Sequence, residues 1–328
     1  MKKLTVIIST IVLSVNVSAQ DFHNSQFEQS SLYLNPALTG QDITEDADWR
    51  AATLYRSQWG QISTKPFSSI YASYDARLKE RWGIGGYIIN NQAGAPTFRT
   101  FNFMVSTSYN VIDPKSDHKL TTGLQLGFFN KSFQVNNLFF DEQYSSTSGG
   151  FDNSLSNGEN IGSSSIYRLD GAWGVYYQFL GKQLRPYIGF SLGHITLPNQ
   201  TFIGETEPMP MIWKANFGSE IAFNDEFSLK PAFLYMYQKA ASEFLLMTTT
   251  KYNFDDDFDL RLLLGIRVGD AAVTGIGMRY HGWHLNMTYD INISTLNTYT
   301  SGRGGFEISL AYQGAFANDK IKKMMGRM

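Results

Sequence analysis

The chain has 328 residues, of which 15% are aromatic and 17% are charged, with a formal net charge of −2. This charge does not favour nucleic-acid binding, and the lack of cysteine excludes a disulfide framework and a lipidated cysteine. After the N-terminal apolar run, no stretch of 18 or more apolar residues occurs, which argues against membrane-spanning helices. The many aromatic residues, 29 glycines and few charges instead suit an outer-membrane barrel, whose strands alternate lipid-facing apolar residues with polar or glycine residues facing the lumen.

The N-terminal segment has the features of an export signal. Two lysines precede an apolar run over residues 4–17, and small residues follow it. This order predicts a signal peptide over residues 1–19 and places the rest of the chain outside the cytoplasm. We expect residues 20–48 to form a periplasmic N-terminal arm.

Within this arm, Asn35, Pro36, Ala37 and Gly40 form a short motif. Proline restricts its own φ and pushes the preceding residue towards extended geometry, asparagine can bond nearby backbone groups, and glycine permits a turn. These properties predict a rigid corner that seats the arm against the periplasmic mouth of a barrel. An ordinary turn before the first strand explains the same residues equally well.

Alternation of apolar and polar side chains dominates the remainder of the chain. In one segment the apolar residues occupy every second position, at Trp283, Leu285, Met287, Tyr289 and Ile291. Similar segments, fourteen in all, are expected at residues 49–58, 67–77, 82–90, 99–110, 119–136, 165–178, 185–194, 212–222, 227–237, 243–252, 259–269, 271–280, 283–292 and 305–313. A soluble β-sandwich can show the same period, but an even number of segments that reach across a bilayer favours an all-β, transmembrane, antiparallel outer-membrane β-barrel over residues 49–313.

The connections between these segments alternate in length. Those at 78–81, 223–226 and 281–282 are short, whereas 137–164 and 195–211 are long. Outer-membrane barrels have short periplasmic turns and long extracellular loops, and a β-sandwich has no reason to keep this asymmetry. Five of the six tryptophans also fall near segment ends, as an interfacial girdle requires, although tryptophan also fills soluble cores: Trp49, Trp59, Trp82, Trp213 and Trp283.

Two further segments have distinctive compositions. Residues 144–165 are rich in serine, glycine and asparagine, which predicts an exposed loop. Residues 314–328 contain three lysines and one arginine beside isoleucine and methionine. This C-terminal tail is either a solvated end or a short basic helix that contacts anionic headgroups or a periplasmic partner.

No catalytic or metal-binding motif stands out. The five histidines lack the spacing of a zinc site, and His284 and Ser294 would lie about 33 Å apart on one strand, too far for a catalytic pair. The acidic run at 255–257 can hold a cation weakly, but such a turn is more often solvated. We therefore predict that the protein is not an enzyme and needs no cofactor or metal.

The motifs, taken in order, resemble the PorP/SprF family of outer-membrane barrels from the type IX secretion and gliding system of Bacteroidetes. The resemblance begins at LNPALTG, continues through LYRSQWG, and includes WGIGGYIINNQAG, FDEQY, GHITLPNQTF, YDINIS and SGRGGFEISLAY. It covers residues 20–313. The matching positions, taken as candidates for partner binding, are Asn35, Pro36, Ala37, Gly40, Tyr55, Arg56, Gln58, Trp59, Asp141, Gln143, His194 and Asp290.

The resemblance implies a barrel that supports secretion and surface attachment of partner proteins such as adhesins. It implies two protein partners, a peptidoglycan-associated periplasmic protein and the C-terminal domain of a secreted surface protein, together with outer-membrane lipid and no nucleic acid. The alternative is an outer-membrane channel for small or hydrophobic solutes, with a pore lined by Arg267, Arg279, Asp290 and Glu307.

Overall fold

The structure is a computed structural model that describes residues 22–44, 46–58, 60, 66–93, 98–134, 141–147, 149–152, 154–155, 164–202, 206–295 and 297–316. Three predictions fall on residues outside these ranges: the signal peptide at 1–19, a girdle position for Trp59, and the basic tail beyond residue 316.

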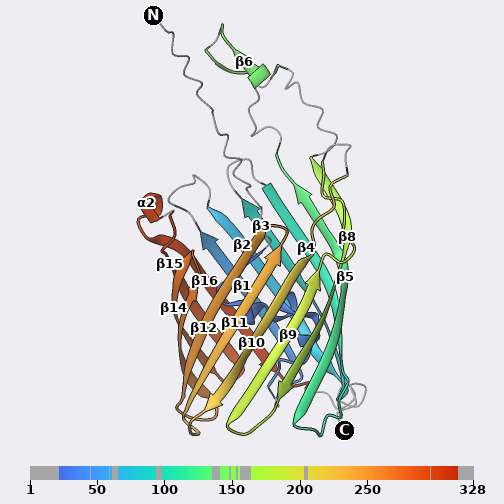
Figure 1. Cartoon of the computed structure of the whole chain (residues 1–328), viewed down its shortest axis with the longest axis vertical. Coiled ribbons are helices and arrows are strands. Elements are labelled where there is room, and N and C mark those ends of the chain that lie inside the picture. The colour runs from blue at the N-terminus through green and yellow to red at the C-terminus, as the bar shows by residue number, and fades with distance from the viewer. Residues whose placement is uncertain are drawn as a thin grey trace, which may run out of the picture.

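Fourteen antiparallel strands close into one barrel, as Figure 1 shows. They are β1 (Trp49–Gln58), β2 (Phe67–Leu78), β3 (Trp82–Ala93), β4 (Phe98–Asn110), β5 (His118–Ser132), β8 (Ser165–Phe179), β9 (Leu184–Gly193), β10 (Ile212–Ala222), β11 (Phe227–Gln238), β12 (Ala241–Asn253), β13 (Phe258–Arg267), β14 (Ala271–Tyr280), β15 (Trp283–Asn292) and β16 (Arg303–Gly314). Each strand pairs with the next one in the wall, and β16 pairs with β1. The predicted fold class is confirmed; the largest difference in bounds is at the end of β5, predicted at residue 136 and observed at Ser132.

Short elements lie at one end of the barrel. The two-residue strands β6 (Tyr144–Ser145) and β7 (Gly150–Phe151) pair as a small hairpin after η4 (Asp141–Gln143), and α2 (Asn297–Thr300) precedes the last strand. In the described part of the chain, no helix is long and apolar enough to cross a membrane.

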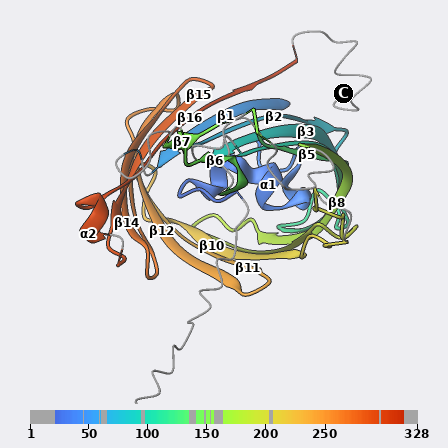
Figure 2. The same ribbon diagram turned by 90° about the horizontal axis from the view of Figure 1, so that it is seen from above.

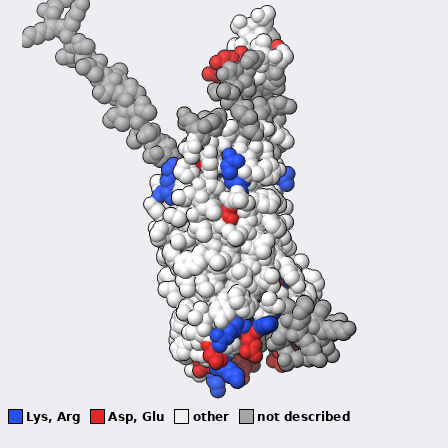
Figure 3. Space-filling model, turned by 90° about the vertical axis from the view of Figure 1, so that its right-hand side faces the viewer, with Lys and Arg blue, Asp and Glu red and all other residues white. Residues whose placement is uncertain are grey.

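The two ends of the barrel differ as predicted. The turns at 79–81, 223–226 and 281–282 lie at one end, which is periplasmic in outer-membrane barrels, and the long connections lie at the other, which we call the extracellular end. Figure 3 shows charged side chains gathered at the short-turn end and few across the middle of the face in view.

The outward side chains form an apolar surface. On β15 the odd-numbered residues point outward, while Asn286, Thr288 and Asp290 are buried inside, which confirms the predicted facing. At the periplasmic end Trp49 and Trp283 both pack on Tyr312, with ring centroids 5.5 and 4.7 Å apart. This aromatic cluster has the position expected of an interfacial girdle.

We expect a charge in the middle of the lipid-facing surface to destabilise the barrel. Leu264 lies in the central part of β13 and is half exposed. Leu264→Arg should lower the free energy of unfolding by about 2–4 kcal/mol, because an arginine at midplane depth loses hydration. Urea unfolding in lipid vesicles measures this loss. The matched variant Tyr280→Arg, near the periplasmic end of the neighbouring strand, should cost about 0–1 kcal/mol, and equal losses would contradict this placement in the bilayer.

The N-terminal arm lies inside the barrel, not at its periplasmic mouth as predicted. Figure 2, which looks down the barrel, shows the arm enclosed by the ring of strands. Residues 22–44, here called the plug, include η1 (Phe27–Ser30), α1 (Ser31–Leu34) and η2 (Pro36–Leu38). The plug descends from the extracellular half of the lumen to the periplasmic end, where it leads into β1.

The lumen face is also more apolar than alternation alone predicts. Phe27, Leu34 and Leu38 of the plug join one buried cluster with apolar side chains of β9 and β11–β14, and Phe22 and Leu32 join another with side chains of β1–β4. Fully burying one such side chain stabilises the folded state by about 1.5–3 kcal/mol. The lumen wall and the plug therefore share a hydrophobic core that a water-filled pore would not have.

Candidate functional site

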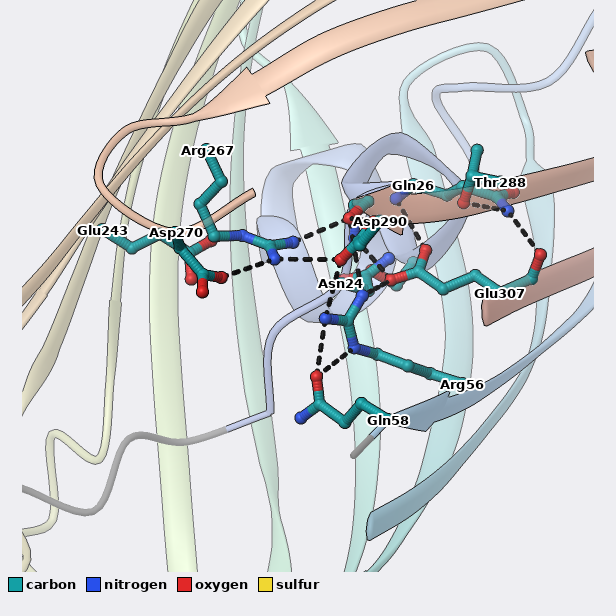
Figure 4. Close-up of polar contacts among 12 residues, drawn as sticks. Asn24, Gln26, Arg56, Gln58, Glu243, Arg267, Asp270, Thr288, Asp290 and Glu307 are labelled. Atoms are coloured by element: carbon teal, nitrogen blue, oxygen red, sulfur yellow. Dashed lines mark hydrogen bonds and ion pairs between the residues drawn. The ribbon is translucent and has the colours of Figure 1, made fainter. Parts of the chain in front are cut away.

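The plug is fixed to the wall in its extracellular half by buried charges (Figure 4). This upper anchor consists of Arg56, Arg267, Asp290 and Glu307 on the wall and Ser25 and Gln26 on the plug. Arg56 pairs with both Glu307 and Asp290, and Arg267 Nη1 lies 3.0 Å from Asp290 Oδ2. All four charged side chains are nearly inaccessible to solvent.

The carboxylates of the upper anchor bind the plug backbone directly. Glu307 accepts the N–H groups of Ser25 and Gln26 at 2.6 and 2.9 Å. Ser25 Oγ donates to Asp290 Oδ1 at 2.7 Å and accepts from Arg267 Nη2 at 2.7 Å. Because buried charges must be paired and hydrogen-bonded, the plug is required to complete this cluster.

The Asn35-Pro36 corner sits in a socket of wall glycines, Gly123, Gly174 and Gly189. A Cβ atom at Gly123 would overlap the Pro36 carbonyl, and one at Gly174 would overlap the Asn35 amide. The side chain of Asn35 accepts from Ala37 N at 2.9 Å and donates to Val175 O at 2.9 Å. The corner is therefore rigid, as predicted, and it packs against the inside of the wall.

The carbonyl groups at the end of α1 find partners on the wall. Leu32 O accepts from Gln125 Nε2 at 2.7 Å, and Leu34 O accepts from Ser191 Oγ at 2.7 Å. Tyr33 O accepts from Lys214 Nζ at 2.6 Å, and this ammonium group lies 3.3 Å from the Tyr33 ring centroid. The last carbonyls of a helix have no partner within the helix, so these contacts tie a short helix to three strands.

We expect Gly123→Ala to lower the free energy of unfolding by about 1–3 kcal/mol, since the added methyl group overpacks the socket and must displace the corner. The control is Gly150→Ala, where a Cβ would contact nothing within 4 Å. Urea unfolding followed by tryptophan fluorescence compares the two variants. If they unfold at the same urea concentration, the socket does not hold the corner.

A second buried ion pair, the lower anchor, holds the plug near the periplasmic end. Arg50 Nε lies 3.1 Å from Asp75 Oδ1, and Arg50 Nη1 lies 2.7 Å from Asp42 Oδ2. Asp75 Oδ2 accepts the N–H of Gly40 at 2.7 Å. Gly40 has a φ of +64°, a conformation that glycine adopts without strain, so its place in the motif follows from this turn.

A cavity of about 1020 Å³ opens between the plug and the periplasmic end of the wall. Its lining includes eight lysines and arginines and four aspartates and glutamates. Among the cations, Lys119 donates to Gln41 O at 3.0 Å and Lys230 Nζ lies 2.9 Å from Glu28 Oε1. The excess of cations makes this cavity suited to an anionic ligand.

The structure brings together only part of the predicted set of candidate residues. Asn35, Pro36 and Ala37 lie at the glycine socket, and Gly40 lies at the lower anchor. Arg56 and Asp290 lie in the upper anchor. Gln58 accepts from Arg56 Nε at 3.0 Å. Tyr55, in contrast, is 39% exposed on the outer wall, where it faces lipid.

Trp59 lies outside the described residues, and the other remaining candidates lie at the extracellular end. Gln143, directly before β6, is buried and donates to Leu155 O at 3.2 Å, and Asp141 is exposed. His194 Nδ1 lies 2.6 Å from Asp170 Oδ2 at the top of the wall. These residues are separate from both anchors.

Sequence reasoning missed several residues that hold the plug: Ser25, Gln26, Arg50, Asp75, Gly123, Gly174 and Gly189. Under the alternative channel hypothesis Arg267 and Glu307 would line a pore, and the structure places them in the upper anchor. The signal that could have found the cluster is the occurrence of opposite charges at lumen-facing positions of β1, β13, β15 and β16. Among the described residues, no group of three or more potential metal ligands occurs.

Comparisons with known proteins give a family and a fold. The family model for the type IX secretion system membrane protein PorP/SprF matches residues 16–312. No curated protein matches the chain.

Solved structures share the architecture at low sequence identity. The toluene transporter TbuX of Ralstonia pickettii has a TM-score of 0.53 at 12% identity, with 88% of this chain and 94% of that chain covered. The toluene transporter TodX of Pseudomonas putida has a TM-score of 0.52 at 11% identity, with 88% and 93% covered. At these identities the likeness concerns the fold.

Proposed function

The chain belongs to the PorP/SprF family of type IX secretion system membrane proteins, and from this premise we propose that it holds secreted partner proteins at the cell surface. The family resemblance predicted from the motifs is thereby confirmed, as is a place in the outer membrane. The proposed role is attachment without chemical transformation of a substrate. Its secreted partners are surface proteins such as adhesins, bound through their C-terminal domains.

The observation that carries this proposal is the plugged lumen between two different ends of the barrel. The plug is anchored at both ends by buried ion pairs and packs on both sides into apolar clusters. Such a barrel is suited to act as a rigid platform. The periplasmic cavity offers cations to the secretion machinery, including a peptidoglycan-associated partner, and the extracellular connections offer polar surface to a secreted protein.

A channel for small or hydrophobic solutes is the second candidate. It is supported by the fold shared with TbuX and TodX, which are toluene transporters, and by the cavity of about 1020 Å³. Solute passage through the barrel axis would require the plug to leave its anchors. The channel proposal therefore predicts solute uptake that depends on plug movement, which the attachment proposal does not need.

Deletion of residues 145–160 tests the attachment role. We expect the barrel to assemble normally, because the described residues of this segment belong to the small β6–β7 hairpin, which is not part of the barrel sheet. We expect the surface level of the secreted partner to fall. Quantitative proteomics of cell surface and medium measures this loss. A variant in which residues 145–160 are replaced by an equal number of glycine and serine residues separates the effect of loop length from the effect of loop sequence. Unchanged surface proteins in the deletion strain, together with lost uptake of an aromatic hydrocarbon, would favour the channel.

A further inference from the structure

Two arginines share one buried aspartate on the lumen face of β13 and β14, near the periplasmic end. Asp259 and Arg279 lie directly opposite each other in the strand pairing, and Arg261 follows Asp259 by two residues on the same face of β13. Arg261 Nε lies 2.7 Å from Asp259 Oδ1, and Arg279 Nε lies 2.6 Å from Asp259 Oδ2. One carboxylate therefore holds two guanidinium groups close together. We call Arg261 and Arg279 the arginine pair.

Most hydrogen-bond donors of the arginine pair have no protein acceptor. A guanidinium group carries five N–H groups. Arg279 donates only through Nε, and Arg261 donates through Nε and through Nη2, which lies 3.3 Å from Asp259 Oδ2 and 3.5 Å from His284 Nδ1. Within the described part of the chain, both Nη groups of Arg279 and Nη1 of Arg261 lack an acceptor. Because the Nε bonds hold both planar groups in place, their remaining N–H groups are ready to bind a ligand.

The neighbouring side chains leave positive charge unbalanced. Lys251 on β12 lies directly opposite Arg261, and its one carboxylate partner among the described residues is Glu220, 3.3 Å from Lys251 Nζ. On the other side, Arg261 lies opposite Gly277, which has no side chain to fill the space. Three cations therefore face two carboxylates, and like charges opposite each other in a sheet destabilise it. A bound anion would relieve this repulsion.

The arginines that hold the plug are balanced differently. Arg56 pairs with two carboxylates and Arg267 with three, and both side chains are almost inaccessible to solvent. The arginine pair makes no hydrogen bond or ion pair with any described residue of the plug, and its two side chains are 17% and 23% exposed. Arg261 and His284 line the periplasmic cavity. The surplus charge of the arginine pair is therefore accessible, and anchoring of the plug does not explain it.

The position of the arginine pair limits what can reach it. The cavity of about 1020 Å³ lies at the periplasmic end and has the size of sites for small molecules. The strand wall separates the lumen from the bilayer, so that a lipid headgroup outside the barrel has no access. The planar N–H fork of arginine matches the oxygen atoms of phosphate and carboxylate groups. The expected ligand is an anion of this kind from the periplasm.

We infer that the arginine pair binds an oxyanion group, a phosphate or a carboxylate, that enters the cavity from the periplasm. The anion accepts hydrogen bonds from the Nη groups of Arg261 and Arg279, while Asp259 acts as a positioning residue that holds both guanidinium groups. The source of the anion is a small solute or an acidic segment of a periplasmic protein. The site goes beyond the attachment role and does not depend on it.

Binding of inorganic phosphate and of a hexaglutamate peptide to the purified barrel tests the site. Isothermal titration calorimetry at constant ionic strength measures both dissociation constants. We expect Arg279→Gln to weaken binding about tenfold, equivalent to one lost charge-assisted hydrogen bond. The matched control Arg185→Gln removes an equal charge from the same cavity, where Arg185 donates to Gly181 O. This control should weaken binding by no more than about twofold, because salt screens a charge outside the site.

The two probes distinguish the two sources. Tighter binding of phosphate indicates a small solute, whereas tighter binding of the peptide, with phosphate as a competitor, indicates an acidic protein segment. The inference is wrong if neither probe binds with a dissociation constant of about 1 mM or lower. It is also wrong if the Arg279 and Arg185 variants weaken binding equally. Should Arg279→Gln fail to fold, Arg279→Lys compared with Arg185→Lys applies the same criterion, because lysine keeps the charge and lacks the fork.

Discussion

Replacing Arg56 by alanine should lower the free energy of unfolding by about 3–5 kcal/mol, the usual cost of removing one partner from a buried ion pair. Arg56 pairs with Glu307 and with Asp290, whose remaining cationic partner in the upper anchor is Arg267. Without Arg56, Glu307 loses its ion-pair partner, and Asp290 keeps only Arg267, which also pairs with Glu243 and Asp270. Because Glu307 also holds Ser25 and Gln26, the upper end of the plug should loosen as well.

Urea unfolding in lipid vesicles measures this effect, and proteolysis within residues 22–30 reports the loosened plug. The control is Arg303→Ala on β16, which removes an exposed arginine and should change stability by no more than about 0.5 kcal/mol. If the two variants unfold at similar urea concentrations, the upper anchor contributes little to the stability of the barrel.

Deletion of residues 24–40 should convert a barrel without steady conductance into an open pore. The deleted segment carries the upper-anchor contacts, the corner and the lower-anchor turn, and it fills the lumen between the two apolar clusters. Water and ions should enter once this segment is gone, because the interior of a barrel of this size exceeds what its own side chains fill.

Planar-bilayer recordings of purified protein measure the conductance. Deletion of residues 145–160 is a control of nearly equal length that leaves the plug in place, and it should not conduct. If the intact chain shows the same large steady conductance as the plug deletion, the plug does not block the lumen.

The wall of the barrel could be predicted from sequence because alternation is a local property. A two-residue period in β15 or β16 follows directly from lipid on one side and a packed lumen on the other. The short turns and long loops also follow from local sequence. They gave the correct order of all fourteen strands, although some bounds differ, such as the end of β5 at Ser132.

The plug could not be predicted, because its position depends on contacts between residues far apart in the chain. Ser25 meets Glu307 across nearly the whole sequence, and nothing near Ser25 indicates that partner. The Asn35-Pro36 corner was recognised as rigid, but the glycines that receive it lie on β5, β8 and β9.

The attachment role is tested most directly by comparing surface and medium proteomes of cells with and without this barrel, with uptake of an aromatic hydrocarbon followed in the same cultures. We expect loss of the barrel to release at least one exported protein from the surface or to prevent its export, with uptake unchanged, and the intact gene to restore it. An unchanged set of surface proteins combined with reduced uptake would contradict the attachment role and support a channel.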